Sequence, residues 1–182
     1  MKSLKQALLA AGILAGGLTF AQNSGMNNML KFGISAGAST GGNTSANVGA
    51  DLSYQNLVTP GFGLGLTTGY KHFFGKDANV NNVKVNNNDF GVVPVAGLIR
   101  IYPKQTGFYF GSDLGYGFIV GEEKVAENSA VDRPDGGFYI KPEIGYHNRD
   151  WNFYAHYTKV FTGDEGKIGD QKYNAGSVGL GI

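Results

Sequence analysis

The sequence predicts an all-β fold: an eight-stranded antiparallel up-and-down transmembrane β-barrel that follows a cleaved signal peptide. Three observations lead to this fold class. Residues 107–121 alternate large apolar side chains with small or polar ones, which is the period of a strand with two unlike faces. Seven further stretches share that alternation, and the first 21 residues resemble an export signal. A membrane-crossing strand needs about 9–11 residues, apolar toward lipid and polar or small toward the lumen.

The composition supports many short strands in a single domain. The chain has 182 residues, with 30 glycines, 13% aromatic residues, 5 prolines and no cysteine. Glycine is used where backbones approach closely or turn, and without disulfides a closed hydrogen-bonded barrel can supply stability. The net charge of +1 gives no strong field toward an acidic partner, so we expect no nucleic-acid binding.

Residues 1–21 are expected to be a signal peptide, and residues 22–182 the barrel domain. Lys2 and Lys5 form a basic start, an apolar run covers 7–15, and small residues precede Gln22. The alternative, a membrane anchor, would need about 20 apolar residues. Residues 22–29 are rich in Asn and are expected to form a loose tail.

The first three expected strands are 30–39, 46–55 and 62–74. In each of them apolar residues alternate with glycine or polar residues. A stretch of Thr, Gly and Asn separates the first two strands, and Pro60-Gly61 closes a compact turn before the third.

The fourth expected strand, 89–102, has a blurred alternation. Val93, Val95, Ile99 and Ile101 form its expected lipid face, which turns Arg100 inward. Pro94 lacks the N–H that a ladder needs, so a bulge is predicted there.

The last four expected strands are 107–121, 137–147, 151–162 and 172–182. Each keeps one apolar parity. Pro142 interrupts the apolar face of the sixth strand, and a second bulge is predicted at this residue.

The connections alternate between long and short, as in an outer-membrane barrel with long outer loops and brief periplasmic turns. The long loops 75–88 and 122–136 collect Asn and charged residues. An even number of strands places both termini on the periplasmic side. Aromatic side chains near strand ends are expected to form two girdles at the headgroup regions: Tyr54, Tyr102, Phe108, Phe138, Tyr146, Trp151 and Phe161.

Two local patterns strengthen this interpretation. Residues 92–95 (VVPV) lead into 100–102 (RIY), and residues 108–110 (FYF) lead into 113–117 (DLGYG). With the signal peptide and the eight alternating segments, they make the chain resemble the small eight-stranded outer-membrane barrels of the OmpA-transmembrane-domain and OmpX type, as found in Bacteroidetes-like bacteria. The resemblance covers 22–182 and implies insertion by the barrel-assembly machinery. Family members usually end in an aromatic residue, whereas this chain ends in Ile182.

Charged residues on the expected lumen face are the candidate functional residues. The interior of an eight-stranded barrel is just wide enough to fill with side chains, and buried charges must pair or hold water. We expect a structural polar network, with Glu143 beside His156 across the sixth and seventh strands; a proton relay or narrow ion path is the alternative. The candidate network residues are Lys31, Asp51, Lys71, Arg100, Asp113, Lys141, Glu143 and His156.

No catalytic, cofactor-binding or metal site is expected. His72, His147 and His156 do not have metal-ligand spacing. A lipid-modifying enzyme would need Ser, His and an acid close together, and nothing ties Ser129, Asp77 and His72 to one another. The Gly-rich stretch 61–65 lies within a strand and opens no helix, so it does not indicate a phosphate-binding loop.

The expected function is that of a non-enzymatic outer-membrane barrel with a structural or surface-interaction role, embedded in outer-membrane lipid. Loops 75–88 and 122–136 are the expected contacts with an extracellular ligand. The alternatives are a small channel, a lipid-modifying enzyme, and a soluble ligand-binding barrel of lipocalin type. The last would need polar side chains outside and apolar ones inside.

Overall fold

The computed structural model describes residues 28–80, 82–104, 107–148 and 151–182. The expected signal peptide, residues 22–27 of the expected tail, and parts of two expected turns lie outside these residues. The described residues form ten strands: β1 Asn28–Ser39, β2 Thr44–Thr59, β3 Phe62–Gly75, β4 Ala78–Val80, β5 Val83–Val85, β6 Phe90–Ile101, β7 Gly107–Gly121, β8 Gly136–His147, β9 Asn152–Phe161 and β10 Ala175–Gly181.

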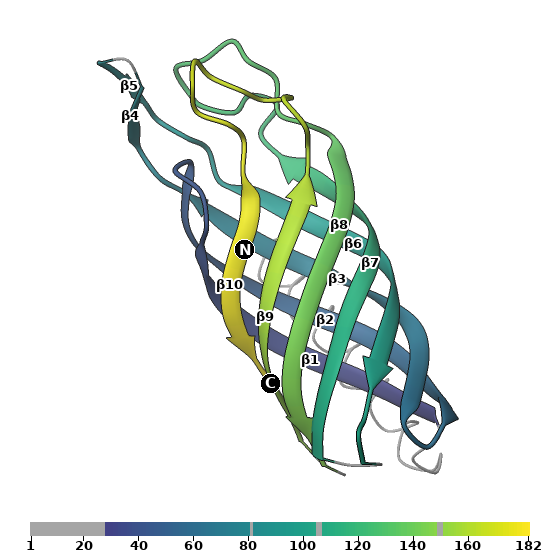
Figure 1. The fold of residues 1–182 in the computed structure, drawn as a ribbon. Coiled ribbons are helices and arrows are strands. Elements are labelled where there is room, and N and C mark those ends of the chain that lie inside the picture. The colour runs from purple at the N-terminus through teal and green to yellow at the C-terminus, as the bar shows by residue number, and fades with distance from the viewer. Residues whose placement is uncertain (1–27, 81, 105–106, 149–150) are drawn as a thin grey trace, which may run out of the picture.

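Eight of these strands form a closed antiparallel barrel in the order β1-β10-β9-β8-β7-β6-β3-β2. Closure is made by β1 and β10, which pair from Ser35 with Gly181 to Ser39 with Ser177. The strands are strongly tilted, and Figure 1 shows them wound around one elongated cylinder. The predicted all-β, eight-stranded, antiparallel barrel is therefore confirmed. No helix among the described residues is long and apolar enough to cross a membrane.

The two ends of the barrel differ. The loop end carries the connections 40–43, 76–89, 122–135 and 162–174, whereas the tight turn 60–61 lies at the opposite end, called the turn end here. Figure 1 shows the loop end uppermost and the C-terminus toward the turn end.

The expected loop 75–88 is not entirely irregular. It contains the short hairpin β4–β5, in which Ala78 pairs with Val85 and Val80 with Val83. Asn82 has a positive φ of 64°, a backbone conformation that asparagine tolerates in tight hairpin turns. The hairpin was missed because each strand has only three residues within an Asn-rich stretch. The second strand was also underestimated, since β2 continues to Thr59.

Neither predicted bulge is present. The β3–β6 register is the same on both sides of Pro94, since Thr68 pairs with Val95 and Lys71 with Val92. Pro142 lies opposite Ser112 in β7, again without a register shift. A proline removes one ladder hydrogen bond, and here the ladder skips that bond without an inserted residue. Register shifts occur instead between β2 and β3.

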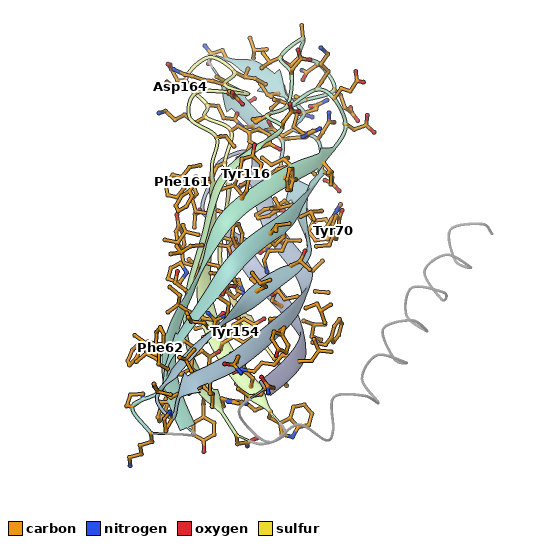
Figure 2. The ribbon with its side chains drawn as sticks, turned by 90° about the vertical axis from the view of Figure 1, so that its right-hand side faces the viewer. Phe62, Tyr70, Tyr116, Tyr154, Phe161 and Asp164 are labelled. Carbon is orange, nitrogen blue, oxygen red and sulfur yellow. The ribbon has the colours of Figure 1, made fainter. Side chains whose placement is uncertain are left out.

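The wall has the predicted orientation. On β7, Phe110 and Phe118 are about half exposed, whereas Tyr109 and Asp113 are buried in the interior. The same alternation along the other strands covers the outside of the barrel with apolar side chains, and Figure 2 shows Tyr70, Tyr116 and Phe161 on the flanks. The interior is filled by two layers: a charged network nearer the turn end and an apolar cluster at the loop end.

Candidate functional site: the filled barrel interior

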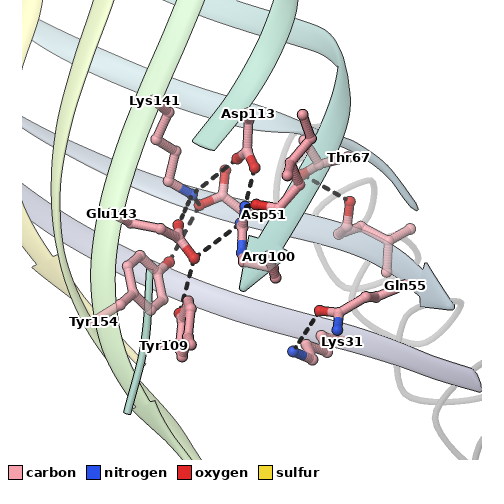
Figure 3. A network of polar contacts seen from close by, with 12 residues as sticks. Lys31, Asp51, Gln55, Thr67, Arg100, Tyr109, Asp113, Lys141, Glu143 and Tyr154 are labelled. Atoms are coloured by element: carbon pink, nitrogen blue, oxygen red, sulfur yellow. Dashed lines mark hydrogen bonds and ion pairs between the residues drawn. The ribbon is translucent and has the colours of Figure 1, made fainter. Parts of the chain in front are cut away.

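Six charged side chains from five strands meet inside the barrel, and Figure 3 shows Asp51, Arg100, Asp113, Lys141 and Glu143 among them. They are Asp51 on β2, Lys71 on β3, Arg100 on β6, Asp113 on β7, and Lys141 and Glu143 on β8. All six occupy the inward parity of their strands, and each is less than 9% exposed. These six residues, which the sequence alternation predicted to face the interior, therefore do face it and lie close together.

One half of the network is centred on Arg100. Its Nη2 lies 2.8 Å from Asp113 Oδ1 and 2.8 Å from Glu143 Oε1. The Tyr109 hydroxyl donates a hydrogen bond of 2.8 Å to the same Glu143 oxygen. Arg100 therefore joins two buried carboxylates that would otherwise repel each other.

The other half is centred on Asp51. Its Oδ2 lies 3.2 Å from Lys71 Nζ and 3.0 Å from Lys141 Nζ, and it accepts a hydrogen bond of 3.3 Å from the Tyr154 hydroxyl. Lys141 connects the two halves, since its Nζ lies 3.7 Å from Asp113 and 3.6 Å from Glu143. The three cations and three anions of this network balance, which limits the cost of burying them.

Glycines in the wall provide room for the long basic side chains. Lys71 lies opposite Gly49, where a Cβ would come within 2.8 Å of Lys71 Cγ. Arg100 lies opposite Gly111, where a Cβ would come within 2.8 Å of Arg100 Nη1. The pairing of a large inward residue with a glycine on the next strand lets a narrow barrel hold these side chains.

His156 and Lys31 lie at the margins of the network. His156 pairs with Glu143 across β8 and β9, as predicted, but its Nδ1 is hydrogen-bonded to Thr158 Oγ1 at 3.1 Å. Lys31 is separate, because its Nζ donates to Gln55 Oε1 at 3.0 Å nearer the turn end. Figure 3 shows the Lys31–Gln55 pair apart from the other charges.

Tyr102 was wrongly assigned to an outer aromatic girdle. It is only 3% exposed and faces the interior, where its ring lies 5.4 Å from that of Tyr109. Its hydroxyl is hydrogen-bonded to Gln55 at the turn end of the barrel. The other six predicted girdle residues are between 45% and 69% exposed.

An apolar cluster fills the interior at the loop end, where the sequence predicted a polar lumen. Phe73 and Phe90 stack with ring centroids 5.0 Å apart, and Tyr173 from the connection 162–174 lies 4.9 Å from Phe90. Val125 enters from the connection 122–135. The signal was present in the inward parity, which turns apolar toward the loop end: Phe73, Phe90, Val92, Ile119 and Val160.

The connections at the loop end are joined to one another. Asn88 N donates to Val125 O, and Glu127 N donates to Asn86 O, each at 3.0 Å. Asn128 then binds Lys84 O in β5 through its side-chain amide. Hairpin β4–β5 and the connection 122–135 therefore form one platform over the apolar cluster.

Burial has a clear effect on one titratable group of the neighbouring connection 162–174. Tyr173 is 6% exposed within the apolar cluster, and burial raises the pKa of its hydroxyl. Among the described residues this hydroxyl has no hydrogen-bond partner.

The residues considered for a lipid-modifying enzyme do not come together. His72 Nε2 lies 3.2 Å from Asp89 rather than Asp77, and Asp77 forms an ion pair of 2.9 Å with Lys84. Ser129 Oγ accepts a hydrogen bond from Val131 N. Within the described part of the chain, no group of three or more His, Cys, Asp or Glu residues could hold a metal ion.

The fold and its interior define a closed eight-stranded antiparallel β-barrel with a filled centre. Comparisons of the chain with protein-family models, with curated proteins and with solved structures found no match.

Proposed function

We propose that the protein is an integral outer-membrane β-barrel that acts as a structural element or binds other molecules through its loops, without catalysis. The observation that carries this proposal is the outward surface of the barrel. Large apolar side chains are exposed around the cylinder, among them Leu66 at 68%, Phe108 at 69% and Leu180 at 70%. A monomeric protein in water rarely exposes so much contiguous apolar surface, whereas a barrel in lipid requires it.

The closed ladder supports the same proposal. In lipid every backbone N–H and C=O must find a partner within the protein, and a closed barrel removes the free edges of a sheet. A closed eight-stranded antiparallel barrel is also what the resemblance to the small outer-membrane barrels of the OmpA-transmembrane-domain and OmpX type implies. In this proposal residues 1–21 direct export, and the barrel-assembly machinery inserts the strands.

The filled interior favours a scaffold over a channel. A water path along the axis would have to pass both the Arg100–Glu143 ion pair and the stacked Phe73 and Phe90. Both layers consist of side chains packed inside the wall. We therefore place the function on the platform formed by hairpin β4–β5 and the connection 122–135, which would face the outside of the cell.

The experiment that tests this function is expression in a Gram-negative host, followed by membrane fractionation and protease treatment of intact cells. The folded protein should fractionate with the outer membrane and run faster on a gel unless it is heated. External protease should cleave only within the connections of the loop end, which are 40–43, 76–89, 122–135 and 162–174. Recovery as a detergent-free soluble monomer would overturn the proposal and favour the lipocalin-type alternative.

A further inference from the structure

One region of the outward surface forms an apolar groove instead of a smooth convex wall. The groove has a volume of about 710 Å³ and lies over β1, β2, β3 and β10, within the range of about 300–1,000 Å³ that is typical of ligand pockets. Its lining includes Ile34, Ala36, Val48, Ala50 and Leu180. The two alanines leave a depression between larger neighbours.

The sheet register shows how the groove runs. One row of outward residues crosses four successive strands and borders the groove on one side: His72, Val48, Ala36 and Leu180. A second, parallel row borders the other side: Tyr70, Ala50, Ile34 and Ile182. In this row Ile34 and Ile182 exchange backbone hydrogen bonds of 2.8 and 3.0 Å. Strands lie about 4.8 Å apart, so the groove crosses roughly 14 Å of wall and is roughly 7 Å wide.

The β3 end of the groove is polar, in contrast to its β10 end. Tyr70 Oη lies 3.3 Å from His72 Nδ1, and His72 Nε2 lies 3.2 Å from Asp89 Oδ2. The second carboxylate oxygen of Asp89 accepts a hydrogen bond of 2.7 Å from Gly75 N. Figure 2 shows Tyr70 on the outer side of the wall. Asp89 belongs to the connection 76–89 at the loop end, so this chain of polar contacts lies where lipid headgroups would meet the apolar band of the wall.

Asp89 is the group that can receive such a partner. Its side chain is 54% exposed, and each carboxylate oxygen has two acceptor positions, of which the described contacts use one. A primary ammonium group supplies both the opposite charge and N–H donors. The groove and its polar end therefore have the chemistry of an amphiphile with an apolar chain and an ammonium headgroup.

We propose that this groove is a binding site for a phospholipid with a primary ammonium headgroup, whose acyl chain lies along Ala36 and Ala50 and whose headgroup binds Asp89. The inference rests on the proposed function, because it requires the outward face to be in lipid. An acyl chain held in the depression at the two alanines would make closer van der Waals contacts with the wall than mobile bilayer lipid does.

The test begins with protein inserted into vesicles of equal parts phosphatidylethanolamine and phosphatidylcholine. The two headgroups carry the same charge, but only the first has N–H donors. After gentle detergent extraction, native mass spectrometry counts the lipid that remains on the protein. The wild-type protein should retain one phosphatidylethanolamine. Asp89→Asn should weaken this retention about tenfold, as for the loss of one charge-assisted hydrogen bond.

Variants that fill the groove separate the acyl site from general lipid contact. Ala36→Phe and Ala50→Phe should lose the retained lipid. The matched control is Gly97→Phe on β6. This position faces outward, and only Leu114 O lies within 4 Å of an added Cβ. The control variant should keep the bound lipid. Inserted, heat-modifiable protein that retains no lipid, or that loses none on filling the groove, would overturn this inference alone. Failure of the wild-type protein to insert would instead overturn the proposed function.

Discussion

The side chain of Arg100 lies across Gly111, its partner residue on the neighbouring strand. From that position the guanidinium group reaches both Asp113 and Glu143 at 2.8 Å. Gly111 therefore supports the ion network without a polar contact of its own, because the space left by its missing side chain holds the side chain of Arg100.

The first prediction is that Gly111→Val displaces Arg100 and destabilises the barrel. The added side chain would occupy the space of the Arg100 stem, so a loss of about 1–3 kcal/mol is expected, as for overpacking of a core. Urea unfolding of the protein in vesicles, followed by loss of heat-modifiable mobility, measures the change. Gly97→Val is the control, because its side chain would enter open space outside the wall. Equal effects of the two variants would contradict the role given to Gly111.

The second prediction concerns charge balance. Asp51→Asn leaves Lys71 and Lys141 without their closest shared carboxylate, and removal of one partner of a buried ion pair costs about 3–5 kcal/mol. The double variant Asp51→Asn/Lys71→Met removes one of the uncompensated cations and should recover part of that loss. The same unfolding measurement checks both variants. If the double variant is less stable than Asp51→Asn, the two side chains do not depend on each other as described.

The third prediction is that the wild-type barrel does not conduct ions. In planar bilayers containing the inserted protein, current should stay at the level of protein-free bilayers, because charged and apolar layers both fill the interior. Stable unitary currents that scale with the amount of inserted protein would contradict this expectation and favour the channel alternative.

Much of this structure could be predicted from alternation along the strands. The period of two places Asp51, Lys71, Arg100, Asp113, Lys141 and Glu143 on inward parities, and closure of a narrow barrel then forces them together. The alternation could not predict contacts that the connections make with distant parts of the chain. The approach of Tyr173 to Phe90 and the bond between Asn88 and Val125 depend on loop conformations that have no periodic signal.

One error and one contact that was not predicted have a related physical origin. Tyr102 follows directly after β6 and was assigned to a girdle by its aromatic character alone, whereas Gln55 on β2 offers its hydroxyl a buried partner. The sequence did not link His72 to Asp77, and it gave no signal for the actual partner Asp89, which directly precedes β6. In both cases the deciding contact joins strands whose register cannot be read from one segment.

The fourth prediction uses the raised pKa of Tyr173. A tyrosine ionises at about pH 10 in the unfolded chain, and burial holds the folded hydroxyl protonated to higher pH, so the folded state binds more protons above pH 10. Stability should therefore fall as pH rises beyond about 10. Tyr173→Phe should weaken this alkaline loss and leave stability near pH 7 unchanged or higher, since the buried hydroxyl has no hydrogen-bond partner among the described residues.

Urea unfolding of the protein in vesicles over a pH series measures the effect of Tyr173→Phe. Exposed Tyr146→Phe on the outer wall is the matched control and should behave like the wild type. An identical alkaline response in all three proteins would show that Tyr173 is not the group responsible.

The most direct test of the account is cysteine scanning along β7, because the chain contains no native cysteine. Single cysteines at 108, 110, 114 and 118, and at the buried inward positions 109 and 119, would each be offered a maleimide attached to a lipid acyl chain, in protein inserted into vesicles. Reaction is expected at the first four positions and little at the other two, because only the first set faces lipid. Reaction at 109 and 119 with protection at 108, 110, 114 and 118 would contradict this orientation of the wall.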